Sequence, residues 1–306
     1  MKHSLSKLII PAKLICASGR ILRYACVCEK DGKAIVTSRR NKRSNEPYPC
    51  YSVSKSTVSL ALGFLFDKGL FDPNDKIADY LAEYFPKDVD QKWNEVKIEH
   101  LFHHRTGTAD KNGFDKISDF DDGEHAWGKQ DNLVKIFSMP IINTPGEVYL
   151  YSDANYYVLA RLAEKLCGMD LCAFLAKNLF QPLGFANYCW TRDLYGHVMG
   201  GTGLMLRTED YAKLGWLWLN KGEYDGVRYL SEKWMTLAIA ASEDRKDNRN
   251  YAYGVRRLGK NNYSITGAMG QGLYFNVQKR FVYAWHATGG NCVMTICEFL
   301  DKLNLL

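Results

Sequence analysis

The stretch YSVSKSTVSLALGFLF, residues 51–66, carries the strongest signals for both fold and chemistry. From Val53 to Phe66 the residues are almost all apolar or small, which is typical of a helix buried on every side. The run ends at Lys68-Gly69, and a glycine directly after a helix is a common C-terminal stop. We therefore predict a buried helix with Ser52 and Lys55 in its first turn.

Ser52 and Lys55 are three residues apart, so they share one face of that helix. A lysine at the head of a buried helix loses contact with water, which favours its neutral form and lets it take a proton from a neighbouring serine. The spacing alone is weak, because Ser4-Leu5-Ser6-Lys7 repeats it near the N-terminus. Only Ser52 opens a buried helix, so catalysis is predicted for the pair Ser52 and Lys55.

Segments expected to form strands lie at both ends of the chain. Near the start, residues 24–29 and 33–38 flank Asp31-Gly32, a pair that favours a tight hairpin. Three more strands and a closing helix are expected over residues 251–257, 273–277, 281–285 and 292–303. The stretch between the two ends is mostly helical in pattern. This order predicts an α+β fold, with one antiparallel sheet built from both termini and a helical insertion.

Length and composition agree with a folded protein of two domains. Hydrophobic residues make up 46% of the 306 residues and charged residues 24%, which excludes a disordered chain. The net charge is only +6. The one basic cluster, Arg39-Arg40 with Lys42-Arg43, is explained by a solvated loop, so no nucleic-acid partner is expected.

Cysteine usage favours a reducing, cytoplasmic compartment. The nine cysteines show no paired spacing, and Cys26 and Cys28 are expected to be buried small hydrophobes. Pro11 and Lys13 interrupt the apolar stretch of residues 8–16, which makes a poor secretory signal and leaves secretion open. The longest uncharged run, residues 281–297, is too short and too rich in glycine to span a bilayer. No membrane association is expected.

Other familiar signatures fail. Residues 254–260 fit most of a phosphate-binding loop, but Asn261 replaces the serine or threonine that holds Mg²⁺. His100, His103 and His104 cluster, yet the H-E-x-x-H pattern and a third ligand are missing, so packing at a helix end explains them. No metal or other cofactor is expected.

Six segments carry a more specific pattern. They are YSVSKS (51–56), IEHLFHHRTG (98–107), TPG (144–146) with YSD (151–153), QPLG (181–184), GGTG (200–203) and TGA (266–268). In this order they resemble the S-x-x-K, H-T-S-G, Y-x-N, P-L-G, glycine-turn and K-T-G or H-x-G motifs of the serine β-lactamase and penicillin-binding protein superfamily. The similarity is strongest to its class C β-lactamase-like esterase branch, and it extends over nearly the whole chain.

The resemblance implies a β-lactamase/transpeptidase-like fold, an antiparallel sheet flanked by helices plus a helical domain. The sheet domain would comprise residues 1–50 and 222–306, the mainly helical domain residues 51–221, and the active site their junction. It implies a serine hydrolase in which Ser52 forms an acyl-enzyme while Lys55 and Tyr151 share the proton transfers.

The remaining site residues follow from the same resemblance. The backbone N–H groups of Ser52 and Ala268 would form the oxyanion hole. The residues expected to bind substrate are Asp153, Ile265, Thr266 and Gly267.

Two residues depart from the family pattern. Asp153 stands where the family often has asparagine, and Ile265 stands where the third motif has lysine or histidine. An isoleucine offers no donor to a substrate carboxylate, so small ester or amide substrates are expected and β-lactam turnover is expected to be weak. Arg256 or Arg257 is the candidate substitute cation. A β-lactamase or D-Ala-D-Ala-type peptidase, and a non-catalytic binding relative, stay open as alternatives.

Overall fold

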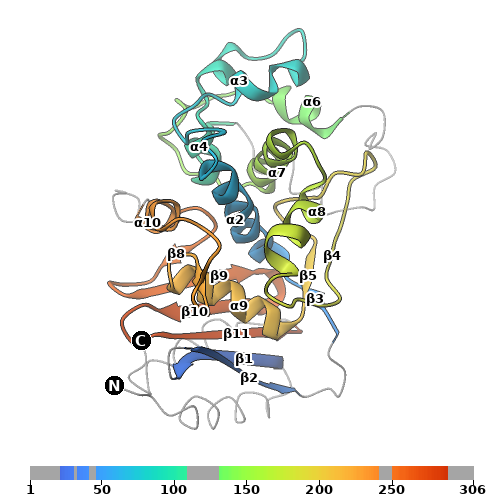
Figure 1. Ribbon diagram of the computed structural model, residues 1–306. Helices are drawn as coiled ribbons and strands as arrows, with labels where there is room; N and C mark the ends of the chain where they lie inside the picture. Colours follow the sequence, from blue (N-terminus) through green and yellow to red (C-terminus); the bar gives the residue numbers. More distant parts are fainter. Residues whose placement is uncertain (1–20, 31–32, 41–45, 109–130, 241–249, 289–306) are drawn as a thin grey trace.

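A computed structural model describes residues 21–30, 33–40, 46–108, 131–240 and 250–288. In this part of the chain, a twisted sheet forms one layer and a group of helices lies at one end of it (Figure 1). The six-stranded sheet has the order β2-β1-β11-β10-β9-β8, and every neighbouring pair is antiparallel. Its strands are β1 (Ile21–Lys30), β2 (Lys33–Arg40), β8 (Arg256–Arg257), β9 (Asn262–Gly267), β10 (Gln271–Asn276) and β11 (Phe281–Ala287).

Both ends of the sequence contribute to this sheet, as predicted. β1 pairs with β2 through Lys30 and Lys33, and with β11 through Cys28 and Phe281. Cys26 and Cys28 are buried, and burial raises the pKa of both thiols, so they behave as small hydrophobes. The α+β fold and the antiparallel pairing of the two strands on either side of residues 31–32 are therefore confirmed.

Several details differ from the sequence-based expectation. The strand expected over residues 251–257 shortens to β8, because Gly254 has φ +82° and only one bridge joins Tyr251 to Arg256. Strand β9 was not expected as a separate element. Arg39 and Arg40 belong to β2 and not to a solvated loop. The helix expected over residues 292–303 lies outside the described residues.

The buried helix predicted after Ser52 is α2 (Ser54–Phe66), and a 3-10 turn, η1 (Tyr51–Val53), precedes it. Nearly all of α2 is buried, because other helices surround it. The other helices are α3 (Ala78–Leu81), α4 (Ile98–Phe102), α6 (Asn132–Phe137), α7 (Asp153–Cys167), α8 (Leu171–Leu175), α9 (Thr208–Leu219) and α10 (Glu232–Ala240). α2 contacts α7, α8 and α10, and thereby forms the centre of the helical part.

Short 3-10 and π turns and two small sheets complete the described structure. The turns are η2 (Ala82–Tyr84), η3 (Gln91–Glu95), η4 (Ala176–Phe180) and η5 (Ala268–Gly270). One small sheet has the order β3-β5-β4, from β3 (Tyr48–Pro49), β5 (Leu204–Leu206) and β4 (Cys189–Trp190), and the other pairs β6 (Glu223–Tyr224) with β7 (Val227–Arg228).

Helix α9 changes the expected domain boundary. It lies across one face of the large sheet and contacts β1, β10 and β11 (Figure 1). Residues 208–219 therefore pack with the sheet, although the resemblance placed them in the helical domain of residues 51–221. The physical reason is the apolar face of α9, whose Leu214 and Leu217 are fully or almost fully buried.

A cluster of aromatic rings fixes the segment before β8 to the helical part. Trp234 of α10 packs against Phe66 of α2, and its indole N–H donates to the carbonyl of Ser59 at 3.2 Å. The ring of Tyr253 stacks on Phe102 of α4, with the ring centroids 4.0 Å apart. These contacts bring the chain from Tyr251 onward against the first turns of α2.

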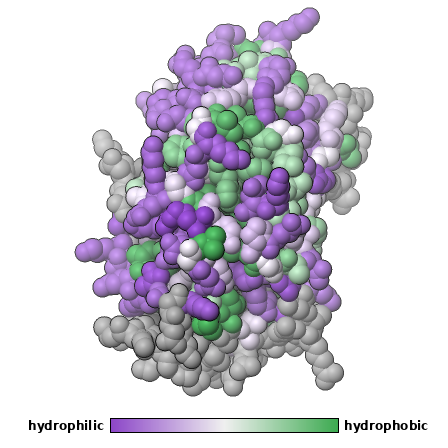
Figure 2. Space-filling model, in the orientation of Figure 1, coloured by the Kyte–Doolittle hydropathy of each residue, from purple (hydrophilic) through white to green (hydrophobic). Residues whose placement is uncertain are grey.

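On the face shown in Figure 2, hydrophilic residues cover much of the surface, and hydrophobic residues gather over the middle of the helical part. No helix among the described residues combines the length and the apolar character that crossing a bilayer requires.

The contact between α9 and the sheet predicts a strong effect of adding a side chain at Gly215. A Cβ there would lie 2.3 Å from Cδ1 of Leu273 and 2.6 Å from Cγ1 of Val282. We expect Gly215→Val to lower the free energy of unfolding by about 1–3 kcal/mol, because the core must expand. The midpoint of urea unfolding measures the loss. Gly259→Val is the control, since a Cβ at Gly259 would meet only Nδ2 of Asn262, at 3.6 Å. An equal effect of both substitutions would contradict the packing argument.

Candidate active site

Ser52 lies in η1, at the point where the chain enters α2. Tyr51 directly before it has φ +49°, a left-handed conformation that costs a non-glycine residue about 1–3 kcal/mol. The hydroxyl of Ser54 donates to the carbonyl of Tyr51 at 2.6 Å and accepts the N–H of Leu204 at 3.2 Å. These bonds hold the sharp turn, which leaves Ser52 partly exposed at the head of a buried helix.

Lys55 lies beneath Ser52 and has no exposed surface. Its ammonium donates to Ser52 Oγ at 3.1 Å, to Asp153 Oδ1 at 2.5 Å and to the carbonyl oxygen of Gly201 at 2.7 Å. An ammonium has three N–H donors, so each one has a partner. Three separate segments of the chain therefore meet at this one nitrogen.

The charge of Lys55 differs from the sequence-based expectation. Burial on its own would lower the pKa of Lys55, but the nearby Tyr151 and Asp153 outweigh burial and place the pKa above its ordinary value. Lys55 is therefore an ammonium at neutral pH in the protein without substrate. The expected depressed pKa of Lys55 is wrong, because Tyr151 and Asp153 together outweigh burial, and Asp153 supplies a carboxylate where the family often has a neutral asparagine.

Tyr151 lies in the segment that leads into α7, and its ring is close to Lys55. The ammonium of Lys55 lies 4.7 Å from the centroid of the Tyr151 ring. Ser152 caps α7, because its hydroxyl accepts the N–H of Ala154 at 3.2 Å, and Asp153 is the first residue of the helix. Tyr151 and Asp153 therefore lie directly before and directly after the capping residue Ser152, and both contact Lys55.

A cavity of about 260 Å³ opens above Ser52. It is lined by Ser52, Tyr151, Tyr251, Gly254, Arg256, Ser264, Thr266, Gly267 and Ala268. Five of these residues were predicted as site residues: Ser52, Tyr151, Thr266, Gly267 and Ala268. Lys55 and Asp153, predicted with them, lie behind Ser52 and are not part of the lining.

Two glycines let the wall formed by β8, β9 and the chain before them approach the first turn of α2. A Cβ on Gly267 would lie 2.4 Å from the carbonyl oxygen of Cys50 and 3.3 Å from the nitrogen of Ser52. A Cβ on Gly254 would lie 2.6 Å from the nitrogen of Ser56. Any side chain at these positions would push the wall away from Ser52.

Ile265 does not line this cavity, which corrects its predicted role in binding substrate. Side chains alternate between the two faces of a strand, so Ser264 and Thr266 face the cavity while Ile265 faces the core. Ile265 is 1% exposed, and its carbonyl accepts the hydroxyl of Tyr211 from α9 at 3.4 Å. Of the two arginines considered as substitute cations, Arg256 lines the cavity and Arg257 does not.

The carbonyl of Gly201 reaches Lys55 from the segment between β4 and β5. This segment lies close against α7, since a Cβ on Gly201 would be 2.8 Å from the carbonyl oxygen of Asp153. A Cβ on Gly200, which has φ +59°, would be 2.3 Å from the carbonyl oxygen of Tyr156. The carbonyl of Gly201 can therefore approach Lys55 because Gly200 and Gly201 have no side chains that would clash with α7.

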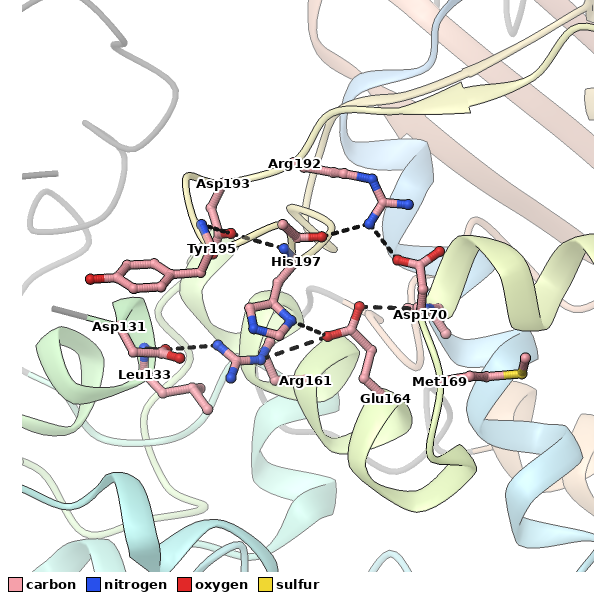
Figure 3. Close-up of polar contacts among 12 residues, drawn as sticks. Asp131, Leu133, Arg161, Glu164, Met169, Asp170, Arg192, Asp193, Tyr195 and His197 are labelled. Carbon is pink, nitrogen blue, oxygen red and sulfur yellow. Dashed lines mark hydrogen bonds and ion pairs between the residues drawn. The ribbon is translucent and has the colours of Figure 1, made fainter. Parts of the chain in front are cut away.

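A polar network ties the outer part of the same segment to α7 and α8 (Figure 3). His197 Nδ1 lies 2.6 Å from Oε2 of Glu164, and Arg192 pairs with Asp170. Asp193 accepts the hydroxyl of the buried Tyr157 at 2.5 Å. A second cavity of about 450 Å³ lies beside this network, and its charged side chains pair with one another. We interpret the network as the anchor of the segment that carries Gly201.

The sequence pattern of the beta-lactamase family matches residues 14–291, which is most of the chain. The chain belongs to the beta-lactamase family.

One relative of the chain has a name that suggests an activity. A protein of Salmonella typhimurium, provisionally named a D-alanyl-D-alanine carboxypeptidase, is 24% identical over 293 residues, which cover 78% of this chain and 65% of the relative. The chain thus spans less than two thirds of that relative's length.

Solved structures share the fold at low identity. A family VIII carboxylesterase has a TM-score of 0.75 at 15% identity, covering 97% of both chains. A penicillin-binding protein from Bacillus halodurans has a TM-score of 0.73 at 16% identity, covering 98% of this chain and all of the other. Likenesses at such identity show the fold alone.

Sequence reasoning missed four contributors to the beta-lactamase-family site. The carbonyl of Gly201 and the cavity residues Tyr251, Gly254 and Ser264 were not predicted as site residues. The glycine turn at residues 200–203 was visible as a motif, but a backbone carbonyl has no signal in a sequence. The alternation around Thr266 could have indicated that Ser264 shares its face.

The bond between Lys55 and Asp153 predicts a shift in the pH dependence of any reaction that needs a neutral lysine. Asp153→Asn removes one of the two groups that raise the pKa of Lys55, so this pKa falls while Tyr151 still opposes the effect of burial. If the neutral form of Lys55 takes the serine proton in this variant, which lacks the Asp153 carboxylate, the rising limb of the plot of kcat/KM against pH moves to lower pH. Hydrolysis of p-nitrophenyl butyrate across the pH range measures the limb.

Asp131→Asn is the control for this experiment, because Asp131 pairs with the buried Arg161 and not with Lys55. The limb should stay in place in this variant. A limb that also stays in place in Asp153→Asn would show that Lys55 does not set the pH dependence.

Proposed function

We propose that the protein is a serine hydrolase that forms an acyl-enzyme on Ser52, and that it acts on small ester or amide substrates. One observation carries the proposal. The ammonium of Lys55 bonds Ser52 Oγ at 3.1 Å at the floor of a cavity, and Tyr151 stands on the wall of the same cavity. A nucleophile, a proton-transfer partner and space for an acyl group therefore occur together.

In the first step, Ser52 Oγ attacks the carbonyl carbon and forms the new C–O bond. Its proton leaves toward Lys55 or Tyr151. Because Lys55 is already charged, it accepts the serine proton only as it passes one of its own protons to Asp153, to which it is bonded at 2.5 Å. The alternative acceptor is Tyr151 in its phenolate form, whose ring centroid lies 4.7 Å from the ammonium of Lys55.

The negative charge on the carbonyl oxygen would be stabilised by the N–H groups of Ser52 and Ala268. Ala268 follows Gly267, the residue whose missing side chain lets β9 approach Ser52. Tyr151 then gives a proton to the leaving group, and water hydrolyses the acyl-enzyme by the reverse sequence of proton transfers.

A second candidate substrate class is favoured by Arg256. Arg256 is the one charged residue among the nine that line the described cavity. Its register partner on β9 is Ser264, and Thr266 lies two residues further along the same face. A guanidinium with two hydroxyls suits a substrate carboxylate, as in a D-alanyl-D-alanine peptide or a β-lactam. The name of the Salmonella relative supports this class.

The role of Ser52 predicts the loss of both turnover and labelling on its removal. Ser52→Ala should lower the hydrolysis of p-nitrophenyl butyrate by about 10³-fold or more and abolish the adduct that a fluorophosphonate leaves. Rates and intact-protein mass spectrometry measure the two effects. Ser59→Ala in the same helix is the control, because its hydroxyl bonds the carbonyl of Lys55 and lies outside the cavity lining. Unchanged turnover in a folded Ser52→Ala variant would overturn the proposal.

The position of Arg256 predicts a charge-dependent effect. Arg256→Gln should lower kcat/KM for an acyl donor with a free carboxylate by about 5- to 150-fold relative to its methyl ester, which corresponds to 1–3 kcal/mol. Paired assays of nitrocefin and of matched acid and methyl-ester substrates measure the ratio. Arg257→Gln is the control, since the side chain of Arg257 donates to the carbonyl of Gly259 and does not line the cavity. An equal loss on acid and ester would favour the neutral substrate class.

A further inference from the structure

His104 lies just after α4 and bonds the chain on both sides of Tyr151. Its carbonyl accepts the N–H of Leu150 at 2.8 Å, and its ring nitrogen Nδ1 accepts the N–H of Ser152 at 3.2 Å. One residue thus fixes the backbone immediately before and immediately after the tyrosine. The mechanism proposed above gives His104 no role.

The ring of His104 also packs against the ring of Tyr151. Their centroids are 4.3 Å apart with an angle of 40° between the planes, the shortest of the ring contacts of His104. The centroids of the Tyr251 and Tyr156 rings lie 5.0 and 5.2 Å from that of His104. These rings help to bury His104, which has no exposed surface. Tyr151 is thus supported along its ring as well as through its backbone.

The hydrogen bonds assign the state of the imidazole. Because Nδ1 accepts from Ser152, and the amide of Asn155 lies 3.3 Å from the same nitrogen, the proton of the neutral ring belongs on Nε2. Nε2 is buried and has no hydrogen-bond partner among the described residues. Burial and the nearby charge of Lys55 hold the pKa of His104 well below its ordinary value, so the ring carries no charge beside that ammonium.

We propose that His104 is a positioning residue that holds the Tyr151 ring against Lys55 and over the cavity of Ser52. The proposal rests on the proposed function, in which Tyr151 transfers protons. His104 does not line the cavity, and Tyr151 is the lining residue that its ring approaches most closely, so it acts through Tyr151.

The backbone of His104 restricts the variants that can test this role. His104 has φ +55°, a conformation that asparagine tolerates better than other non-glycine residues. His104→Asn keeps an acceptor near the position of Nδ1 but loses the ring. His104→Phe keeps a ring but leaves the N–H of Ser152 without its acceptor. The two variants therefore separate the hydrogen bond from the ring contact.

The test is a double-mutant cycle with Tyr151→Phe. Tyr151→Phe alone should lower kcat by about 10²- to 10⁴-fold, with a larger loss on an anilide than on the matching p-nitrophenyl ester. His104→Phe alone should lower kcat by about 10- to 10²-fold with the same leaving-group dependence, and KM should change little. In the Tyr151→Phe background, His104→Phe should cause a further change of no more than about twofold.

A full additional loss in that background would overturn the proposal, because His104 would then act independently of Tyr151. If His104→Phe fails to fold, the same cycle with His104→Asn decides the question. His286→Asn is the matched control, since His286 is a second fully buried histidine bonded through Nδ1, here to Thr208 in the sheet domain. It should lower the thermal midpoint without changing the leaving-group dependence.

A second measurement keeps this inference separate from the proposed function. ¹⁵N NMR of histidine-labelled protein, with His104 assigned by comparison with His104→Asn, should show a proton on Nε2 and none on Nδ1. A proton on Nδ1 would overturn the arrangement even in an active enzyme. The absence of a fluorophosphonate adduct on wild-type Ser52 would overturn the proposed function while the NMR result stood.

Discussion

The arrangement of the site depends on one buried cation. The ammonium of Lys55 would be costly inside the protein without partners, and a buried charge that loses a partner typically destabilises a fold by about 3–5 kcal/mol. Its partners come from three segments, the turn before α2, the start of α7 and the glycine turn. Each segment must therefore pack correctly before the charge is compensated. The requirement that stabilises Lys55 also brings Ser52, Asp153 and Tyr151 together.

The opposite wall of the site depends on the absence of side chains. Gly254 and Gly267 let the sheet side of the molecule contact the first turn of α2 at distances that no Cβ would allow. Gly200 and Gly201 do the same for the glycine turn against α7. The cavity therefore lies where the backbone around Gly254 and Gly267 approaches the turn that contains Ser52. Its polar character comes from the few side chains that project into that space, among them Arg256 and Ser264.

The features that could be predicted from the sequence are those with a local or ordered signal. The long apolar run predicted α2, Asp31-Gly32 predicted the first hairpin, and the order of the motifs predicted the site residues Ser52 and Tyr151.

What could not be predicted depends on long-range geometry. Ile265 was misplaced because one residue along a strand separates the cavity face from the core face. The charge of Lys55 depends on Asp153, 98 residues away, and the spacing of S-x-x-K contains no information about that contact.

The pairing of β1 with β11 has a consequence for how the chain acquires its structure during synthesis. Ile21 of β1 pairs with Ala287 of β11, so β1 cannot complete its pairing until a strand more than 250 residues later has been synthesised. The hairpin of β1 and β2 and the helices around α2 use local contacts and can form on the ribosome. The wall of the cavity that contains Thr266 and Ala268 cannot form at that stage, because its residues are synthesised much later. Ser52 is therefore synthesised long before the residues that complete its cavity, and the site can form only after β9, β10 and β11 have been made.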